Sequence, residues 1–186
     1  MAGEPGARYT HRRVTLSAAT TLVTLVLSMA LADQARFPTV TSKNLEGRAM
    51  TLPADFAGTR NVVFVAFERK QQDMVDTWVP FVKANVGRIP GTEYYEIPTI
   101  GPVIRLLQWT INRGMRGGIP DIKARERTVT LYLDKGPFKQ SLGITTEGTI
   151  HVLVVDRAGL VLWRETGAFT EAKGAALVQA LTPTQP

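Results

Sequence analysis

The pattern of apolar and polar positions along the chain predicts an alternation of strands and helices. Residues 61–67 (NVVFVAF) form a nearly continuous run of β-branched and aromatic side chains, which is typical of a strand buried on both faces of a sheet. Further strands are predicted at residues 93–100, 128–133, 151–155 and 160–164, the last two as a hairpin that turns at Gly159. Because a strand buried on both faces needs helices on both sides, the pattern indicates an α/β fold.

After the first strand, residues 71–84 have the period of an amphipathic helix. Six apolar side chains gather on one side of this helix: Met74, Val75, Trp78, Val79, Phe81 and Val82. Pro80 removes a backbone hydrogen bond within the helix and is expected to kink it. Two shorter helices are predicted nearer the C-terminus, one that ends at Leu142 and one that is capped by Thr170 and ends at Leu181.

A second amphipathic helix is predicted within residues 101–118. Pro102 is a favourable first-turn residue, and a group of glycines ends the helix: Gly114, Gly117 and Gly118. The apolar face of this helix collects Val103, Ile104, Leu106, Leu107, Ile111 and Met115. Arg105, Arg113 and Arg116 fall on the opposite arc, with Trp109 among them.

The first 32 residues predict a secretory signal peptide. A basic pair at Arg12 and Arg13 precedes a charge-free apolar run over residues 14–32, and the run ends in the sequence Ala-Leu-Ala, a suitable cleavage site. Cleavage after Ala32 would place the protein in the periplasm or outside the cell. The alternative is an uncleaved anchor in the inner membrane, with the domain facing the periplasm, because the run is near the lower limit of roughly 17 to 25 residues for a spanning helix.

The remaining residues are sufficient for one domain with a proper hydrophobic core. We expect an N-terminal extension with a hairpin over residues 33–58, the domain itself over residues 59–181, and a disordered tail over residues 182–186. The net charge of +6 is modest and the arginines are dispersed, so nucleic acid is not expected as a partner. Because His151 is the one histidine after the predicted signal peptide, we expect neither a metal centre nor another cofactor.

Two stretches of the chain resemble the thioredoxin-like superfamily. The first combines Phe67-Glu68-Arg69 with Gln72 and Trp78-Val79-Pro80-Phe81. The second comprises Leu142-Gly143-Ile144, Gly148, Val154-Val155-Asp156, Gly159, Leu162-Trp163-Arg164 and Gly167. The pattern is similar to the family of mitochondrial assembly factors for ATP synthase and to peroxiredoxin-like domains. The resemblance spans residues 40–181 and implies a three-layer sandwich with a central mixed sheet, into which the second amphipathic helix is inserted.

The chain departs from this superfamily at the residues that perform its chemistry. Gln72 and Val75 stand where thioredoxin-like proteins hold their two redox cysteines, five residues before Pro80 in the case of Val75. Ile150 stands where redoxins have a cis-proline and peroxiredoxins an arginine. The chain contains no cysteine, so thiol–disulfide exchange and cysteine-dependent peroxidase chemistry have no nucleophile.

The turn at the vacated redox position is one candidate binding site. Five polar residues lie there, at the start of the first helix: Glu68, Arg69, Gln72, Asp73 and Asp76. In open α/β sheets, ligands bind outside the carboxyl ends of the strands, where this turn is expected. Two alternatives remain open: a solvated helix start in which Asp73 interacts with the helix dipole, and an enzyme that uses the carboxylates of the Glu68–Asp76 turn as general acid and base.

The second candidate site is the arc of Arg105, Trp109, Arg113 and Arg116 on the inserted helix. An exposed tryptophan between arginines is typical of a protein-interface anchor or of a helix that lies on anionic lipid; in the alternative, Trp109 covers a neighbouring loop. These features together predict an exported, non-redox binding or assembly protein that acts through protein–protein contacts near the membrane. The expected partner is a protein, with a membrane protein among the candidates, and an anionic membrane surface is the other option.

Overall fold

The computed structural model describes residues 34–182. The predicted signal peptide and its cleavage site after Ala32 therefore lie outside the described residues, as does nearly all of the predicted tail. From Ala35 onward the chain forms one compact unit. Among the helices in this part of the chain, none has the length and apolarity needed to cross a bilayer.

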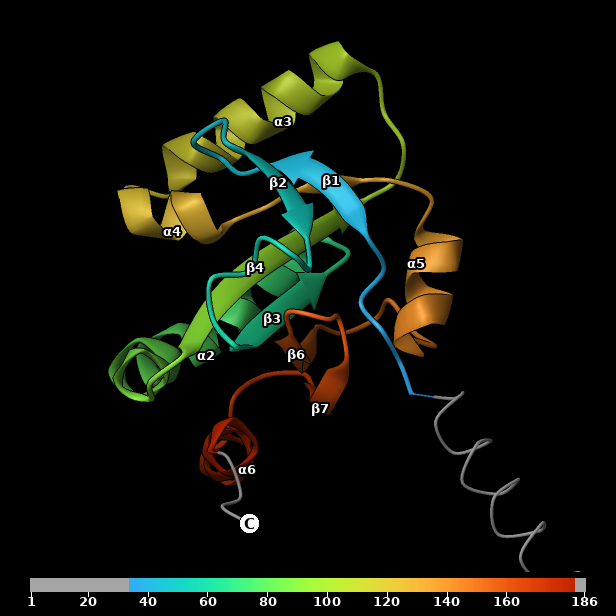
Figure 1. The fold of residues 1–186 in the computed structure, drawn as a ribbon. Helices are drawn as coiled ribbons and strands as arrows, with labels where there is room; N and C mark the ends of the chain where they lie inside the picture. The colour runs from blue at the N-terminus through green and yellow to red at the C-terminus, as the bar shows by residue number, and fades with distance from the viewer. Residues whose placement is uncertain (1–33, 183–186) are drawn as a thin grey trace, which may run out of the picture. The chain divides into compact units, whose positions relative to one another are not determined.

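The centre of the domain is a five-stranded mixed sheet in the order β5-β4-β3-β6-β7 (Figure 1). Its strands are β3 (Arg60–Ala66), β4 (Thr92–Ile100), β5 (Leu131–Tyr132), β6 (His151–Asp156) and β7 (Val161–Thr166). The pairs β3–β4 and β4–β5 are parallel, whereas β6 runs antiparallel to both β3 and β7. The expected central mixed sheet is confirmed.

The other elements surround this sheet. The helices are α2 (Gln72–Asn85), α3 (Arg105–Gly118), α4 (Ile122–Arg127), α5 (Lys135–Leu142) and α6 (Glu171–Leu181), with short 3-10 turns η1 (Arg69–Gln71) and η2 (Val86–Arg88). A separate antiparallel hairpin, β1 (Val40–Lys43) and β2 (Ala49–Leu52), precedes β3. The predicted α/β three-layer sandwich with an inserted amphipathic helix is therefore present.

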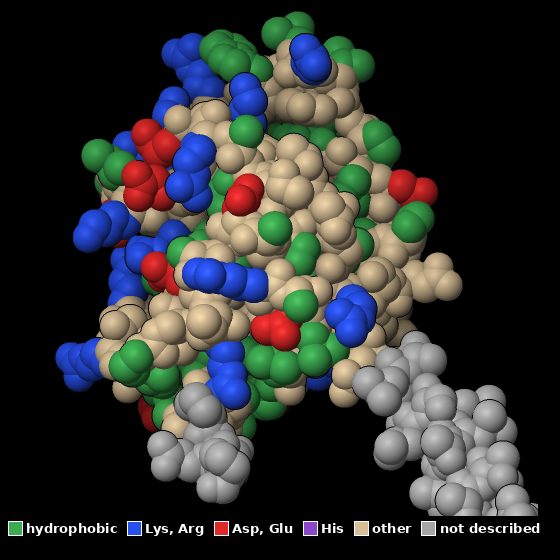
Figure 2. Space-filling model, in the orientation of Figure 1, with side chains coloured by type: hydrophobic (Ala, Val, Ile, Leu, Met, Phe, Trp, Pro, Cys, Tyr) green, Lys and Arg blue, Asp and Glu red, His purple; other side chains and the backbone are tan. Residues whose placement is uncertain are grey.

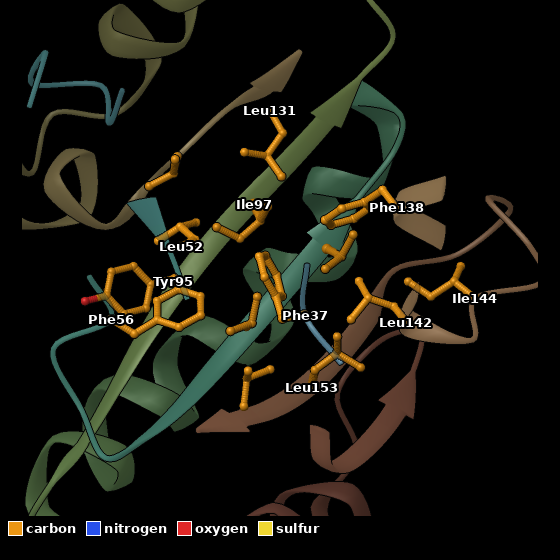
Figure 3. Packing of buried hydrophobic residues seen from close by; sticks show 14 of the residues in the cluster. Phe37, Leu52, Phe56, Tyr95, Ile97, Leu131, Phe138, Leu142, Ile144 and Leu153 are labelled. Atoms are coloured by element: carbon orange, nitrogen blue, oxygen red, sulfur yellow. The ribbon is translucent and has the colours of Figure 1, made fainter. Parts of the chain in front are cut away.

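Alternating side chains of β3 build two hydrophobic cores, one on each face of the sheet. Val62 and Phe64 pack with α2 and α6 on one face. Val63 and Val65 pack on the other face with the hairpin and α5, in the cluster shown in Figure 3. Burial of successive residues on opposite faces explains why the β3 sequence is continuously apolar.

Helix α2 follows its predicted period. Val75, Trp78 and Val82 are buried against the sheet, and the indole Nε1 of Trp78 donates a hydrogen bond of 2.9 Å to the Gly167 carbonyl. The helix continues through Pro80, which is exposed. The polar end of the tryptophan thereby joins α2 to the turn that follows β7.

Gly159 occupies the predicted turn between β6 and β7. Its φ of +84° lies in the left-handed region, which side chains rarely adopt. A Cβ atom at this position would also lie 2.8 Å from the Phe37 carbonyl oxygen. The turn therefore needs glycine both for its backbone conformation and for the close passage of the N-terminal segment.

The elements predicted between β4 and α5 differ from those in the structure. Helix α3 begins at Arg105 rather than Pro102, because Ile104 is extended (φ −63°, ψ 153°). Helix α4 was not predicted. The strand expected over residues 128–133 is reduced to the two residues of β5, since Thr128 and Val129 form isolated bridges to different partners before the ladder with β4 begins.

Candidate functional site

The turn at the vacated redox position is closed by the side chain of Gln71. This amide is fully buried, and its Oε1 accepts hydrogen bonds from the backbone N–H groups of Phe67 (2.8 Å) and Glu68 (3.3 Å). Its Nε2 donates to the Glu147 carbonyl at 2.5 Å. One side chain therefore joins the end of β3 to the loop that precedes β6.

Glu147 extends this connection to α5. Its carboxylate forms ion pairs with Lys135 and, at 2.7 Å, with Lys139. The hydrogen bonds from these two lysines hold the pKa of Glu147 below its usual range. Lys135 also lies 5.7 Å from the centre of the Phe67 ring. The end of β3, the loop before β6 and helix α5 are thus held together by one amide and two ion pairs.

Two of the three positions at which redox residues were expected, Val75 and Ile150, lie in the core. Val75 is 2% exposed within the apolar side of α2, and Ile150 is fully buried before β6. Between residues 34 and 182, the single cis peptide bond joins Leu52 to Pro53 and so lies in the hairpin region rather than before β6. Val75 and Ile150 are therefore part of the aliphatic packing of the domain.

Gln72 faces a different group of residues. Its Nε2 donates to Oδ1 of Asp76 at 2.9 Å and to Oε2 of Glu96 on β4 at 3.4 Å. Burial raises the pKa of Glu96, and the nearby charge of Asp76 acts in the same direction, while the hydrogen bond from Gln72 opposes them. The arrangement is a pair of carboxyl groups bridged by one amide.

The five polar residues predicted to form one site are thus divided. Gln72 donates hydrogen bonds to both Asp76 and Glu96, whereas Glu68 pairs with Lys70 at 2.7 Å on the surface. Arg69 and Asp73 are exposed. Within residues 34–182, no three His, Asp or Glu side chains are grouped as a metal ion would require.

A hollow of about 370 Å³ lies at the opposite end of β3. Thr59, Arg60 and Asp156 are among the residues that line it. Since these residues lie at the start of β3 and the end of β6, the hollow is separate from the Gln71 turn and from Glu96.

Helix α3 is fixed to the sheet edge through its inner side. The Tyr132 hydroxyl donates to Oδ1 of Asn112 at 2.8 Å, and the Thr130 hydroxyl contacts the Met115 sulfur at 3.7 Å. At the end of the helix, Nη1 of Arg125 on α4 donates to the Ile119 carbonyl at 3.1 Å. Contacts with the sheet edge on one side and with α4 at the end of the helix therefore fix the position of α3.

The outer side of α3 holds the second predicted group of residues, which we call the docking face: Arg105, Trp109, Arg113 and Arg116. Trp109 is 58% exposed, and the Arg113 guanidinium lies 5.2 Å from the centre of its ring. Arg116 pairs with Glu46 at 3.2 Å, and Glu46 also binds Arg125. The tryptophan is therefore presented to solvent rather than covering a neighbouring loop.

The apolar face predicted for α3 is wrong in part. Ile111 and Met115 are half-buried, but Ile104, Leu106 and Leu107 are exposed. The first turn of the helix extends beyond the body of the domain, so the domain does not cover these three side chains (Figure 1).

Gln71 and Glu96 were not among the predicted site residues. Gln71 lies four residues before Val75 and seven before Trp78, on the buried stripe of the helix, and this spacing is a signal that it points inward. Glu96 stands two residues after Tyr94 on the same face of β4, which α2 covers. Its alternation with a buried residue could have identified it.

No described protein family and no curated protein matches the sequence. Solved structures do match. The exposed lipoprotein thioredoxin Etrx1 of Streptococcus pneumoniae is 13% identical, with 77% of this chain and 98% of that chain covered and a TM-score of 0.50. StoA from Bacillus subtilis is 14% identical over 80% of this chain and 99% of that one, with a TM-score of 0.50.

A third similar structure is BsSco, a member of the Sco family of cytochrome c oxidase assembly proteins. It is 14% identical, with 80% of this chain and 95% of that chain covered and a TM-score of 0.54. Identities at this level show the fold alone. The chain has a thioredoxin-like fold, and its sequence contains no cysteine.

Proposed function

We propose that this protein is an exported, non-redox binding protein of the assembly or chaperone type, which holds a partner protein near the membrane through the docking face of α3. The observation that supports this most directly is the exposure of Trp109 on a helix whose inner side is fixed by hydrogen bonds. Tryptophan and arginine are the residues most enriched among those that dominate binding energy at protein interfaces. A fixed helix presents them with little conformational entropy to lose on binding.

The closed turn at the redox position supports a role other than thiol chemistry. Thioredoxin-like oxidoreductases need a thiolate that a substrate can reach. Here the chain has no cysteine, and Gln71 and Glu147 occupy the junction between β3 and β6. Binding in this protein is therefore proposed at the surface of α3 and not at the closed turn.

Two of the similar structures agree with this class of function. BsSco belongs to a family of assembly proteins, and Etrx1 is an exposed lipoprotein. Together with the apolar run over residues 14–32, they support export of this chain with cleavage after Ala32, the anchored form being the alternative. Amino-terminal sequencing of the envelope protein separates the two, because the cleaved form begins at Asp33.

Site-specific photocrosslinking in the native envelope tests the proposed partner. A photoreactive residue at Arg113 should give a discrete crosslinked protein, while the same residue at Glu171, on α6 away from α3 (Figure 1), should not. The crosslink at position 113 should be lost when Trp109→Ala is added. Crosslinks of equal yield at both positions, or a crosslink that persists without Trp109, would contradict the proposal.

A second candidate function rests on the raised pKa of Glu96. A carboxyl group with a raised pKa beside a second carboxyl group can serve as general acid, with Asp76 as general base. This is the enzyme alternative stated above, with Glu96 on β4 in place of Glu68 as the partner of Asp76. A panel of ester and glycoside substrates compared between the native protein and Asp76→Asn tests it, because turnover that survives this substitution excludes the pair.

A further inference from the structure

The large exposed hydrophobic side chains of this domain are concentrated at one place. In the part of the chain that the structure describes, six such residues are exposed: Ile104, Leu106, Leu107, Trp109, Ile122 and Leu162. Four of them fall within six consecutive positions at the start of α3. Scattered exposed hydrophobics need no explanation, but a cluster of this kind marks an interaction site.

Three of these residues form what we call the apolar tip: Ile104, Leu106 and Leu107. Their exposed fractions are 73%, 70% and 45%. Figure 2 shows hydrophobic and basic side chains together at the top of the molecule, where α3 begins. Ile104 and Leu106 are thus the two most exposed of the large hydrophobic side chains in the described part of the chain.

The apolar tip does not form a single helical face. Leu106 and Leu107 point about 100° apart around the helix axis because they are consecutive. Ile104 precedes the helix in an extended conformation. A groove in a partner protein accepts one stripe of side chains with helical spacing, whereas the fluid interior of a bilayer surrounds a protruding end from all sides.

The charge around the tip has one sign. Between Glu96 and Asp121 the sequence contains no acidic residue and three arginines, of which Arg105 and Arg113 are exposed and Arg116 pairs with Glu46. Arg105 lies within the tip itself, and the long apolar stem of an arginine can stay buried while its guanidinium reaches the surface. Trp109 follows at a position suited to the boundary between acyl chains and headgroups, where tryptophan is enriched.

We infer that the apolar tip of α3 inserts into the surface of an anionic bilayer, with Arg105 at the lipid phosphates. The inference goes beyond the proposed function: it shares Arg105 and Trp109 with the docking face, but it rests on Ile104, Leu106 and Leu107 and is probed at position 106, whereas the docking face is probed at position 113. Insertion of the tip directs α6, at the far end of the molecule, away from the membrane (Figure 1). It also places the docking face where a membrane protein could reach it.

A local probe in the full chain tests the inference. Because the chain contains no cysteine, Leu106→Cys gives one thiol that accepts the environment-sensitive fluorophore NBD. Leu106 is exposed, so the substitution removes little packing. The labelled protein is mixed with vesicles of phosphatidylcholine and with vesicles that also contain phosphatidylglycerol. Glu171→Cys with the same label is the control, because this exposed residue lies on α6.

Insertion predicts a blue shift and an increase in NBD emission at position 106 with the anionic vesicles. The response should be absent at position 171, smaller with neutral vesicles, and reduced by added salt or by Arg105→Gln. A local probe is needed because the run over residues 14–32 can bring the full chain to vesicles by itself.

Three results would overturn the inference. Emission at position 106 that stays unchanged while the chain co-sediments with vesicles would show that the N-terminal run binds instead. Equal responses to neutral and anionic vesicles would exclude the assigned headgroup contact. A response that requires a crosslinked partner protein would identify the tip as a protein interface. The crosslink at position 113 is scored separately, so failure of the inference does not decide the proposed function.

Discussion

The Tyr132 hydroxyl on β5 donates a 2.8 Å hydrogen bond to Oδ1 of Asn112 on α3. It also lies 3.3 Å from the Gln108 carbonyl, one turn earlier in the same helix. Burial raises the pKa of Tyr132 to about 12, so the phenol remains a donor throughout the physiological pH range. A two-residue edge strand therefore fixes the helix that presents the docking face.

We predict that Tyr132→Phe loosens α3 without unfolding the domain. Loss of this bond should lower the free energy of unfolding by about 1 kcal/mol. Hydrogen exchange measured by mass spectrometry should become faster over residues 105–118, because the helix loses its hydrogen bond to the sheet edge. Tyr95→Phe is the matched control, since the Tyr95 hydroxyl accepts a hydrogen bond from the Ala57 N–H and makes none to α3. Equal exchange of α3 in both variants would show that Tyr132 does not hold it.

Trp109→Ala should separate docking from stability. Since Trp109 is mostly exposed, its loss should change the free energy of unfolding by about 0.5 kcal/mol or less. Loss of an interface anchor should weaken docking by about 2 kcal/mol. Leu162→Ala, another exposed hydrophobic on β7, should affect neither quantity. A thermal melt that falls strongly for Trp109→Ala, with docking unchanged, would refute the assigned role.

Gln71→Ala should destabilise the domain more than an ordinary polar substitution. It leaves the Phe67 N–H and the Glu147 carbonyl without the partner that the buried amide supplied. Unpaired buried groups cost about 1–3 kcal/mol each, so a loss of about 2 kcal/mol or more is expected in urea denaturation. Gln72→Ala, at the adjacent and half-exposed position, should cost clearly less. Similar midpoints for the two variants would mean that water replaces the Gln71 amide.

Much of the fold could be predicted from the sequence, because the local order of apolar and polar residues determines where these strands and helices lie and which of their faces are buried. The continuous apolar run over residues 61–67 predicts a strand buried on both faces, and that strand is found. The helical spacing of Val75, Trp78 and Val82 predicts the side of α2 that is buried against the sheet. The last helix also matches, since Thr170 caps it by accepting from the Lys173 N–H. In these elements, propensity and tertiary packing agree.

The candidate site could be predicted less well, because its contacts join distant segments. Gln71 meets Glu147 across 76 positions in the chain, and no local pattern shows that pairing. Glu96 reaches Gln72 across two layers of the fold. Leu106 has the spacing of a core residue, but whether a helix turn is covered depends on where the neighbouring elements end. The periodicity of a helix predicts which side chains share a face, but not whether another part of the domain packs on that face.

The raised pKa of Glu96 predicts a pH-dependent effect of Glu96→Gln. A carboxyl group whose pKa is raised on folding stabilises the domain fully at low pH, and this stabilisation is lost as the pH rises through the folded value. At pH 7, above the ordinary carboxyl pKa, the burial that raises the pKa of Glu96 lowers the stability of the native protein, so Glu96→Gln should raise the melting temperature. The gain should shrink as the pH falls toward the ordinary value of 4.5. Thermal melts of both proteins between pH 4 and pH 7 test this prediction. A difference in melting temperature that favours the variant more at pH 4 than at pH 7 would contradict a raised pKa for Glu96.

The bridge from Gln71 to Glu147 bears on whether redox chemistry could be restored to this backbone. Cysteines in place of Gln72 and Val75 would recreate the spacing of the motif, but the second sulfur would lie in the apolar core of α2, where burial disfavours a thiolate. The buried amide would still join the two loops, and Ile150 would still fill the opposite wall. We therefore expect that introducing two cysteines would not by itself give this domain thiol chemistry, because the packing around them would remain unchanged.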